Sequence, residues 1–242
     1  MVLKYCNLTL INISMKVGNF VQSIDYFTPW LDNLEFEWGI LTELGEKQRY
    51  KKGELIFQEG DEISEILIVL VGRVRLFTNT IHGKEKTHLI IGKNGLLGEH
   101  FYSGYKKQIL NGEAVSDLIC RGIPLEKFID NVENNYKLLN EVLSLSNLKM
   151  ITIANSSNMD INHGTSLQKI VKILIYLNKV YGVTVGNGYS KISISFTQQE
   201  IADLVGVSRV TVSKSLSRLI KNRILYKEKS YYYLNELRMK EL

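Results

Sequence analysis

Residues 196–219 read Phe-Thr-Gln-Gln-Glu-Ile-Ala-Asp-Leu-Val-Gly-Val-Ser-Arg-Val-Thr-Val-Ser-Lys-Ser-Leu-Ser-Arg-Leu, and they carry the clearest structural pattern in the C-terminal part of the chain. Thr197 followed by Glu200 forms a capping box, which starts a short helix. Gly206 stands where a sharp turn requires a positive φ, and Ser208 is a suitable cap for a second helix. The stretch therefore predicts two helices joined by a tight turn.

The apolar residues of both helices recur at helical spacing. They are Ile201, Leu204 and Val205 in the first helix and Val212, Leu216 and Leu219 in the second. Ala202 is small where the second helix must cross closely. This is the helix-turn-helix pattern, in which the second helix enters the DNA major groove.

The outward face of the second helix carries the residues expected to read DNA. The side chains of Arg209 and Lys214 can donate hydrogen bonds to guanine acceptors or to phosphates. Val210 matches the thymine methyl group, the apolar feature of the major groove, although an exposed valine without a partner is also common. The full set of predicted DNA-binding residues is Thr197, Gln198, Ser208, Arg209, Val210, Thr211, Ser213, Lys214, Ser217 and Arg218.

The sequence around this motif completes a small basic domain. Residues 167–181 predict an amphipathic helix ending near Gly182, and residues 224–234 predict a hairpin that forms a wing. Residues 164–242 contain 13 lysines and arginines against 5 acidic residues, whereas residues 1–163 contain 17 against 20. This asymmetry indicates that only the C-terminal part approaches a polyanion.

The N-terminal part has a different pattern. Residues 1–48 predict short helices, with Phe27, Trp30, Leu31, Leu34, Phe36 and Trp38 as their apolar side chains. Residues 50–115 alternate short β-branched runs with glycines, which indicates an antiparallel barrel or sandwich. His82-Gly83 is expected at a hairpin tip. Pro124 then opens a helical region.

That helical region carries a coiled-coil seam. Val132, Tyr136, Leu139, Leu143, Ser146, Met150 and Ile153 follow one another at alternating spacings of four and three. Leu138, Val142 and Leu145 form a second apolar line, so the helix needs two partners: its own β-domain and the same helix of a second copy. A helix wholly buried inside a monomer is the alternative. The polar residues 155–164 predict a hinge, which divides the chain into domains 1–160 and 161–242.

Composition excludes several classes of protein. Hydrophobic residues make up 45% of the 242 residues and charged residues 23%, which indicates a globular chain and no membrane span. No signal peptide is apparent, so we expect a cytoplasmic protein. Two cysteines, Cys6 and Cys120, are too few for a disulfide scaffold or a four-cysteine cluster. The four histidines show no metal-ligand spacing, and no nucleophile elbow or P-loop motif indicates an enzyme.

These features together resemble the CRP/FNR family of bacterial transcription regulators. Residues 50–77 resemble its cyclic-nucleotide-binding β-roll, residues 123–128 and the following helix match its layout, and the winged helix-turn-helix completes it. The resemblance implies an α+β chain with a β-roll, a long dimerisation helix at about 132–155 and the DNA-binding domain. It also implies a homodimer that binds palindromic double-stranded DNA and meets RNA polymerase.

The resemblance implies an effector pocket after the Gly98-Glu99 pair. Its expected residues are Leu97, Gly98, Glu99, His100, Phe101, Gln108 and Ile109. Cyclic-AMP-responsive members have an Arg-Ser pair about ten residues after the Gly-Glu pair, because the arginine side chain binds the cyclic phosphate. Gln108-Ile109 supply no charge there, and Lys106 or Lys107 replaces a guanidinium poorly, so the effector is expected to be another small molecule. His100 lies near the haem-ligand position of the carbon-monoxide-sensing branch.

The pattern is similar to the CprK-type halorespiration regulators. These also lack the phosphate arginine, and they read DNA with Val-Thr-Val-Ser and a basic residue, here Val210 to Lys214. Many relatives carry Glu where this chain has Val210, so we expect an A/T-rich half-site read partly by methyl contact. The resemblance implies an unidentified small-molecule effector, for which an aromatic acid is one candidate. The alternatives are a constitutive regulator, a redox switch through Cys6 and Cys120, a haem-responsive regulator or, remotely, an enzyme.

Overall fold

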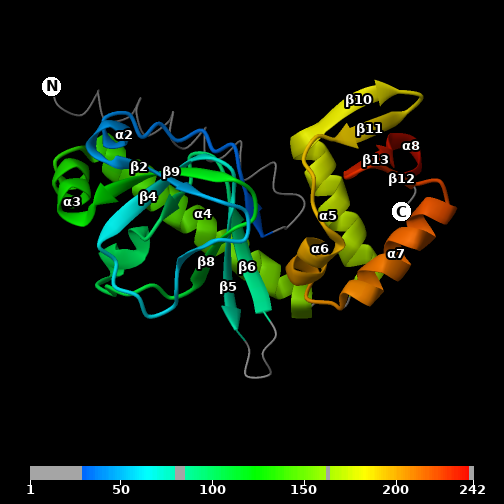
Figure 1. The fold of residues 1–242 in the computed structure, drawn as a ribbon, viewed down its shortest axis with the longest axis horizontal. Coiled ribbons are helices and arrows are strands. Elements are labelled where there is room, and N and C mark those ends of the chain that lie inside the picture. The colour runs from blue at the N-terminus through cyan, green and yellow to red at the C-terminus, as the bar shows by residue number, and fades with distance from the viewer. Residues whose placement is uncertain (1–28, 80–84, 162–163, 240–242) are drawn as a thin grey trace, which may run out of the picture. The chain divides into compact units, whose positions relative to one another are not determined.

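The computed structural model describes residues 29–79, 85–161 and 164–239 (Figure 1). These residues form two compact units, 29–154 and 155–239. The expected division after residue 160 lies slightly further along the chain, within the same helix. None of the described helices is both long and apolar enough to cross a membrane.

Two β-sheets build the first unit and share one hydrophobic core. The first sheet has the order β1-β6-β5-β8-β3, with bounds Trp30–Leu31, Glu85–Ile91, Val74–Asn79, Asn111–Ala114 and Leu55–Phe57. The second has the order β2-β9-β4-β7, with bounds Glu46–Tyr50, Leu118–Pro124, Glu65–Val71 and Leu96–Leu97. The expected antiparallel architecture is confirmed for all strand pairs of this unit except β1 with β6. β5 and β6 form the expected hairpin, and its tip lies outside the described residues.

Within residues 29–48, the part of the first segment that the structure describes, the expectation of several short helices is wrong. Trp30 and Leu31 form β1, which pairs in parallel with β6, and among these residues only α2 (Leu41–Leu44) is an α-helix. The backbone bonds decide this: the Pro29 carbonyl accepts from Ile90 N at 2.7 Å and the Leu31 carbonyl accepts from Gly92 N at 2.7 Å. The buried apolar side chains therefore lie at a sheet edge. Phe27 lies outside the described residues.

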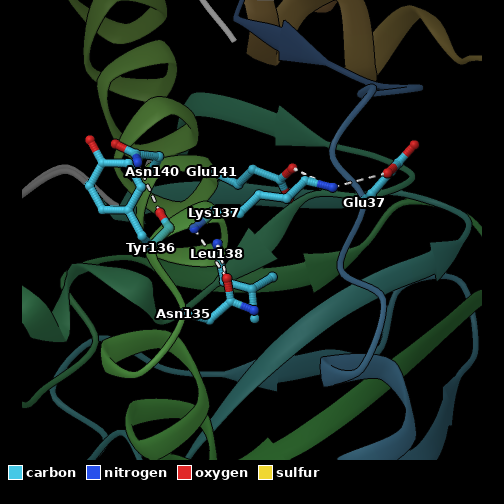
Figure 2. Close-up of polar contacts among 7 residues, drawn as sticks. All are labelled: Glu37, Asn135, Tyr136, Lys137, Leu138, Asn140 and Glu141. Atoms are coloured by element: carbon cyan, nitrogen blue, oxygen red, sulfur yellow. Dashed lines mark hydrogen bonds and ion pairs between the residues drawn. The ribbon is translucent and has the colours of Figure 1, made fainter. Parts of the chain in front are cut away.

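The helical region after Pro124 consists of two helices, α3 (Leu125–Glu133) and α4 (Tyr136–Ile161). The side chain of Asn135 starts α4 by accepting hydrogen bonds from Lys137 N at 3.1 Å and Leu138 N at 3.3 Å (Figure 2). Lys137 Nζ lies 3.3 Å from a carboxylate oxygen of Glu37, a contact that Figure 2 marks with a dashed line. The long helix therefore begins at Tyr136 and not near residue 132.

The end of α4 also differs from the prediction. The polar residues expected to form a hinge are helical as far as Ile161. Serine and asparagine cost only a few tenths of a kcal/mol in a helix that has already formed, because propagation is much easier than nucleation. Residues 162–163 of the expected hinge lie outside the described part of the chain.

Among its described residues, the second unit contains the end of α4, four further helices and one four-stranded sheet, all labelled in Figure 1. The helices are α5 (Ser166–Tyr181), α6 (Gln198–Val205), α7 (Arg209–Lys221) and α8 (Glu236–Met239). The sheet has the order β10-β11-β13-β12, with bounds Gly182–Gly186, Tyr189–Ile192, Tyr231–Asn235 and Leu225–Glu228. The expected wing is the hairpin of β12 and β13. The hairpin of β10 and β11 was not predicted.

Gly206 allows α6 to end and α7 to begin. Its φ is 72°, and a β-carbon built there would meet nothing within 4 Å. Only the conformational preference of the backbone thus opposes a side chain at this turn.

Replacing Gly206 by alanine should lower the free energy of unfolding by about 1 to 2 kcal/mol, the cost of a left-handed conformation for an L-residue. Calorimetric unfolding of the full chain measures this. Gly164→Ala is the control, because its β-carbon would have only ordinary contacts at 3.8 Å or more. Equal stability of the two variants would contradict the assignment.

Candidate nucleic-acid interface and cavity

The capping box at the start of α6 is present as predicted. Thr197 N donates to Glu200 Oε2 at 2.5 Å, and Glu200 N donates to Thr197 Oγ1 at 3.1 Å. These bonds satisfy two backbone donors that the first turn of a helix leaves free. The start of α6 is thereby fixed by two side chains three residues apart.

The second helix of the motif, α7, is stabilised by an N-cap and by the buried residues of its inner face. Ser208 Oγ accepts from Thr211 N at 3.1 Å and lies 2.9 Å from Thr211 Oγ1. The residues buried between the two helices are Ile201, Ala202, Val205, Val212, Leu216 and Leu219. Every predicted inner-face residue is buried except Leu204, which is half-buried.

The opposite face of α7 is open to solvent. Val210 exposes 62% of its surface, and Arg209, Lys214, Ser217 and Arg218 are also exposed. Thr211, Ser213 and Gln198 are half-buried, while Thr197 and Ser208 are exposed but engaged in caps. The structure thus brings the predicted DNA-binding residues to α7 and the starts of both helices. The arrangement presents two cations and one apolar side chain near the N-terminal end of α7, suited to a groove with acceptors and methyl groups.

The first unit contains a cavity of about 660 Å³. Six of the seven residues predicted for the effector pocket line it: Leu97, Gly98, Glu99, His100, Gln108 and Ile109. Phe101 is the exception: it lies in the 3₁₀ helix η1 (Glu99–Ser103) and packs against the core and Tyr102. The far wall comes from α4 through Leu143, Ser146 and Lys149, followed by Met150 and Ile153.

A buried ion pair lies at the wall of this cavity. Lys149 Nζ donates to Glu99 Oε1 and to the Leu96 carbonyl, the latter at 2.6 Å. Both residues are buried, and Glu99 Oε2 has no hydrogen-bond partner among the described residues. Lys149 was not predicted, because fifty residues separate it from Glu99. A lysine within the apolar arc of α4 was the one available signal.

Two further predicted positions bear on the kind of ligand. Gln108 is buried and Ile109 is half exposed, so neither places a positive charge where the cyclic-nucleotide readers have arginine. His100 Nε2 lies 2.9 Å from the Lys107 carbonyl, so this ring nitrogen already has a protein partner. Within residues 29–79, 85–161 and 164–239, no group of three or more His, Cys, Asp or Glu side chains is arranged to hold a metal ion.

α4 has apolar side chains on two faces. Leu138, Val142, Leu145 and Leu148 are buried in the core of the first unit. Of the predicted seam, Tyr136, Leu143 and Met150 are exposed, and Leu139 and Ile153 are half-buried. Val132 is a correction: it lies on α3 and is fully buried, so it cannot contact a second copy.

Cys120 is buried on β9. Burial first, and the neighbouring Glu65 second, raise the pKa of its thiol to about 12. A thiol in this environment stays protonated and unreactive at neutral pH. Cys6 lies outside the described residues.

Comparison with known proteins identifies both units. The cyclic nucleotide-binding domain model matches residues 47–135, and the Crp-like helix-turn-helix domain model matches residues 168–242. The CRP-like cAMP-activated global transcriptional regulator of Mycobacterium tuberculosis is 25% identical over 174 residues, covering 69% of this chain and 74% of that protein. The HTH-type transcriptional regulator ArcR of Staphylococcus epidermidis is 24% identical over 78% of this chain and 82% of its own.

Solved structures show the same fold. FixK2 from Bradyrhizobium japonicum has a TM-score of 0.69 at 17% identity, covering 82% of this chain and 96% of its own. OCPA-complexed CprK has a TM-score of 0.67 at 22% identity, covering 89% and 98%. With a nucleotide-binding-type domain followed by a Crp-like helix-turn-helix, the chain belongs to the CRP/FNR family of DNA-binding transcription regulators.

Proposed function

We propose that the protein is an effector-responsive regulator that binds an A/T-rich inverted repeat as a homodimer. The exposed face of α7 carries the proposal, because Arg209, Val210 and Lys214 lie together on it without a protein cover. Val210 supplies the methyl contact that favours thymine, and the two cations meet phosphates or guanine. Lysine at 214 reads a base less sharply than arginine, because it lacks the planar fork.

A second copy covers the outer face of α4 in this proposal. Tyr136, Leu143 and Met150 form an apolar row on one side of the helix, which is the pattern of a coiled-coil seam. A two-fold dimer then presents two recognition helices about 34 Å apart, one turn of DNA. Inverted repeats in DNA match this symmetry.

The cavity of the first unit takes the effector. Its lining is mostly apolar, which suits an aromatic or aliphatic body. The relative from Mycobacterium tuberculosis is cAMP-activated, but Gln108 and Ile109 carry no positive charge that would bind a cyclic phosphate here. The CprK structure contains OCPA, and an aromatic acid with a mostly apolar body matches the apolar wall of this cavity.

The same side chains serve the cavity and the seam. Leu143, Met150 and Ile153 line the cavity and belong to the predicted dimer row. A ligand that displaces these side chains therefore changes the packing between the two copies of α4, and the altered tilt sets the spacing of the recognition helices. Occupancy of the cavity and affinity for DNA are coupled by shared residues.

The alternatives receive less support. A redox switch through Cys120 needs a thiolate that burial suppresses, and a haem-responsive regulator needs His100, whose Nε2 is already engaged. A constitutive regulator would leave a cavity of about 660 Å³ without a purpose. We place the protein in the cytoplasm with RNA polymerase as a further partner, because it regulates transcription.

Arg209→Ala combined with Lys214→Ala should weaken binding to an A/T-rich inverted repeat at least about tenfold and make its salt dependence shallower, because phosphate and base contacts are lost. Fluorescence anisotropy at several salt concentrations measures both. Lys47→Ala with Lys172→Ala removes equal charge at exposed positions outside α7 and should change little. Unchanged affinity in the first double variant would refute the assigned reading face.

Leu143→Glu should raise the dissociation constant of the homodimer at least about 100-fold, since an unpaired carboxylate buried at a packed interface costs about 3 kcal/mol or more. Sedimentation velocity over a concentration series measures this. Ile40→Glu places the same carboxylate at a similarly exposed apolar position outside α4 and should remain dimeric. A wild-type monomer, or a dimeric Leu143→Glu variant, would refute the seam.

OCPA and related aromatic acids should raise the melting temperature of the wild-type chain by mass action, and cyclic AMP should not. Ser146→Phe fills the cavity wall and should abolish the shift. Ser144→Phe makes the same change at a position on α4 that does not line the cavity and should preserve it. If Ser146→Phe kept the full shift, the ligand would bind elsewhere.

A further inference from the structure

The connection between α7 and the wing is short. Only residues 222–224 separate α7 from β12. The backbone angles of these three residues therefore set the direction of the wing relative to the helix that reads DNA. Both elements would have to meet one duplex at the same time.

This connection is a Schellman turn with an arginine in the position where glycine is favoured. Ile224 N donates to the Leu219 carbonyl at 3.0 Å, and Arg223 N donates to the Ile220 carbonyl at 2.9 Å, which is the pattern of that motif. Arg223 has a φ of 55°. An L-residue in this conformation carries strain, and it persists only where surrounding contacts hold it.

Three contacts from other elements hold the turn. The Asn222 carbonyl accepts from Arg238 Nη1 at 2.8 Å, and the Arg223 carbonyl accepts from Tyr189 Oη at 3.2 Å. The Ile224 carbonyl accepts from Asn235 N at 2.8 Å. Each consecutive carbonyl of the turn is thus bound, by α8, β11 and β13 in order.

The ring of Tyr189 adds a second attachment. It meets the ring of Tyr226 on β12 edge to face, with centroids 5.1 Å apart, and Tyr226 stacks on Tyr233 of β13 at 4.4 Å. One residue of β11 therefore contacts both the turn after α7 and the first strand of the wing. Arg238 is placed in its turn by Asn235, whose side chain accepts from Arg238 N at 3.1 Å.

We propose that Tyr189 and Arg238 are positioning residues for DNA recognition, which hold the strained turn and so fix the angle between the recognition helix and the wing. The proposal rests on the proposed function, in which α7 reads the major groove. Neither residue needs to touch DNA. Their hydrogen bonds lie at the surface, where each contributes little to stability, so their main effect falls on geometry and not on folding.

The test uses the full-length chain and two DNA probes, an inverted-repeat duplex selected by the wild-type protein from a random pool and a duplex of unrelated sequence. Tyr189→Phe with Arg238→Met removes both donors and keeps the side-chain sizes similar. Affinity for the selected duplex should fall about tenfold, equivalent to one lost base contact. Affinity for the unrelated duplex should stay within about twofold of a control, because phosphate binding tolerates a small change of angle.

The controls separate position from charge and stability. Thr184→Val with Lys172→Met removes one hydroxyl and one positive charge outside α7 and the wing, and the described residues offer the Thr184 hydroxyl no hydrogen-bond partner. Tyr189→Phe with Arg238→Lys should recover most of the selectivity, because lysine still donates. Melting temperatures should agree among these variants within a few degrees.

Wild-type selectivity in the Tyr189→Phe, Arg238→Met variant would overturn the proposal, as would equal losses on both duplexes. Lys214→Ala is measured alongside as the contact reference. If the wild type selects no sequence, or Lys214→Ala binds as the wild type does, the proposed reading face itself has failed. If Lys214→Ala weakens binding and the positioning variants do not, only the present inference has failed.

Discussion

The two-sided apolar character of α4 is the constraint on which the structure of the first unit depends. Leu138, Val142, Leu145 and Leu148 bury one face against the β-sheets, and this contact supplies the hydrophobic stabilisation that keeps the helix in place. Leu143 and Met150 leave the other face apolar and exposed. A helix fixed on one side and uncovered on the other can form one wall of a cavity and a partner interface with the same side chains.

The buried Lys149–Glu99 pair places two opposite charges in the wall of that cavity. Burying either charge alone in an apolar wall would cost free energy. The pair lowers this cost because the two ions neutralise each other and Lys149 also donates to a backbone carbonyl. A ligand entering the cavity therefore meets an ammonium whose charge is already compensated. Such an environment suits a mostly apolar ligand better than a cyclic phosphate, because a phosphate would need an unpaired cation such as the arginine that this chain lacks.

In the second unit, some elements depend on contacts between neighbours along the chain, and others depend on contacts between residues far apart in the sequence. Caps at Thr197 and Ser208 start the two helices through residues three positions apart. The turn after α7 is instead bound by Tyr189 and Arg238, which lie 34 residues before and 16 residues after the residues whose carbonyls they bind, Arg223 and Asn222. The reading helix is therefore defined locally, and its orientation to the wing is defined by the rest of the unit.

The sequence alone determined what depends on neighbours along the chain: the capping box at Thr197, the positive φ at Gly206, the period of the apolar residues in α4 and α7, and the charge asymmetry. It also located six cavity residues through a family pattern. Tertiary structure decided the rest. Trp30 lies in a strand because β6 supplies backbone hydrogen-bond partners for that segment. α4 continues past Asn155 because an existing helix extends at little cost. Val132 lies in the core because it belongs to α3, which ends at Glu133, and not to α4. Lys149 met Glu99, and Tyr189 met Arg223, only because folding brought distant residues within hydrogen-bond distance, which no periodicity in the chain records.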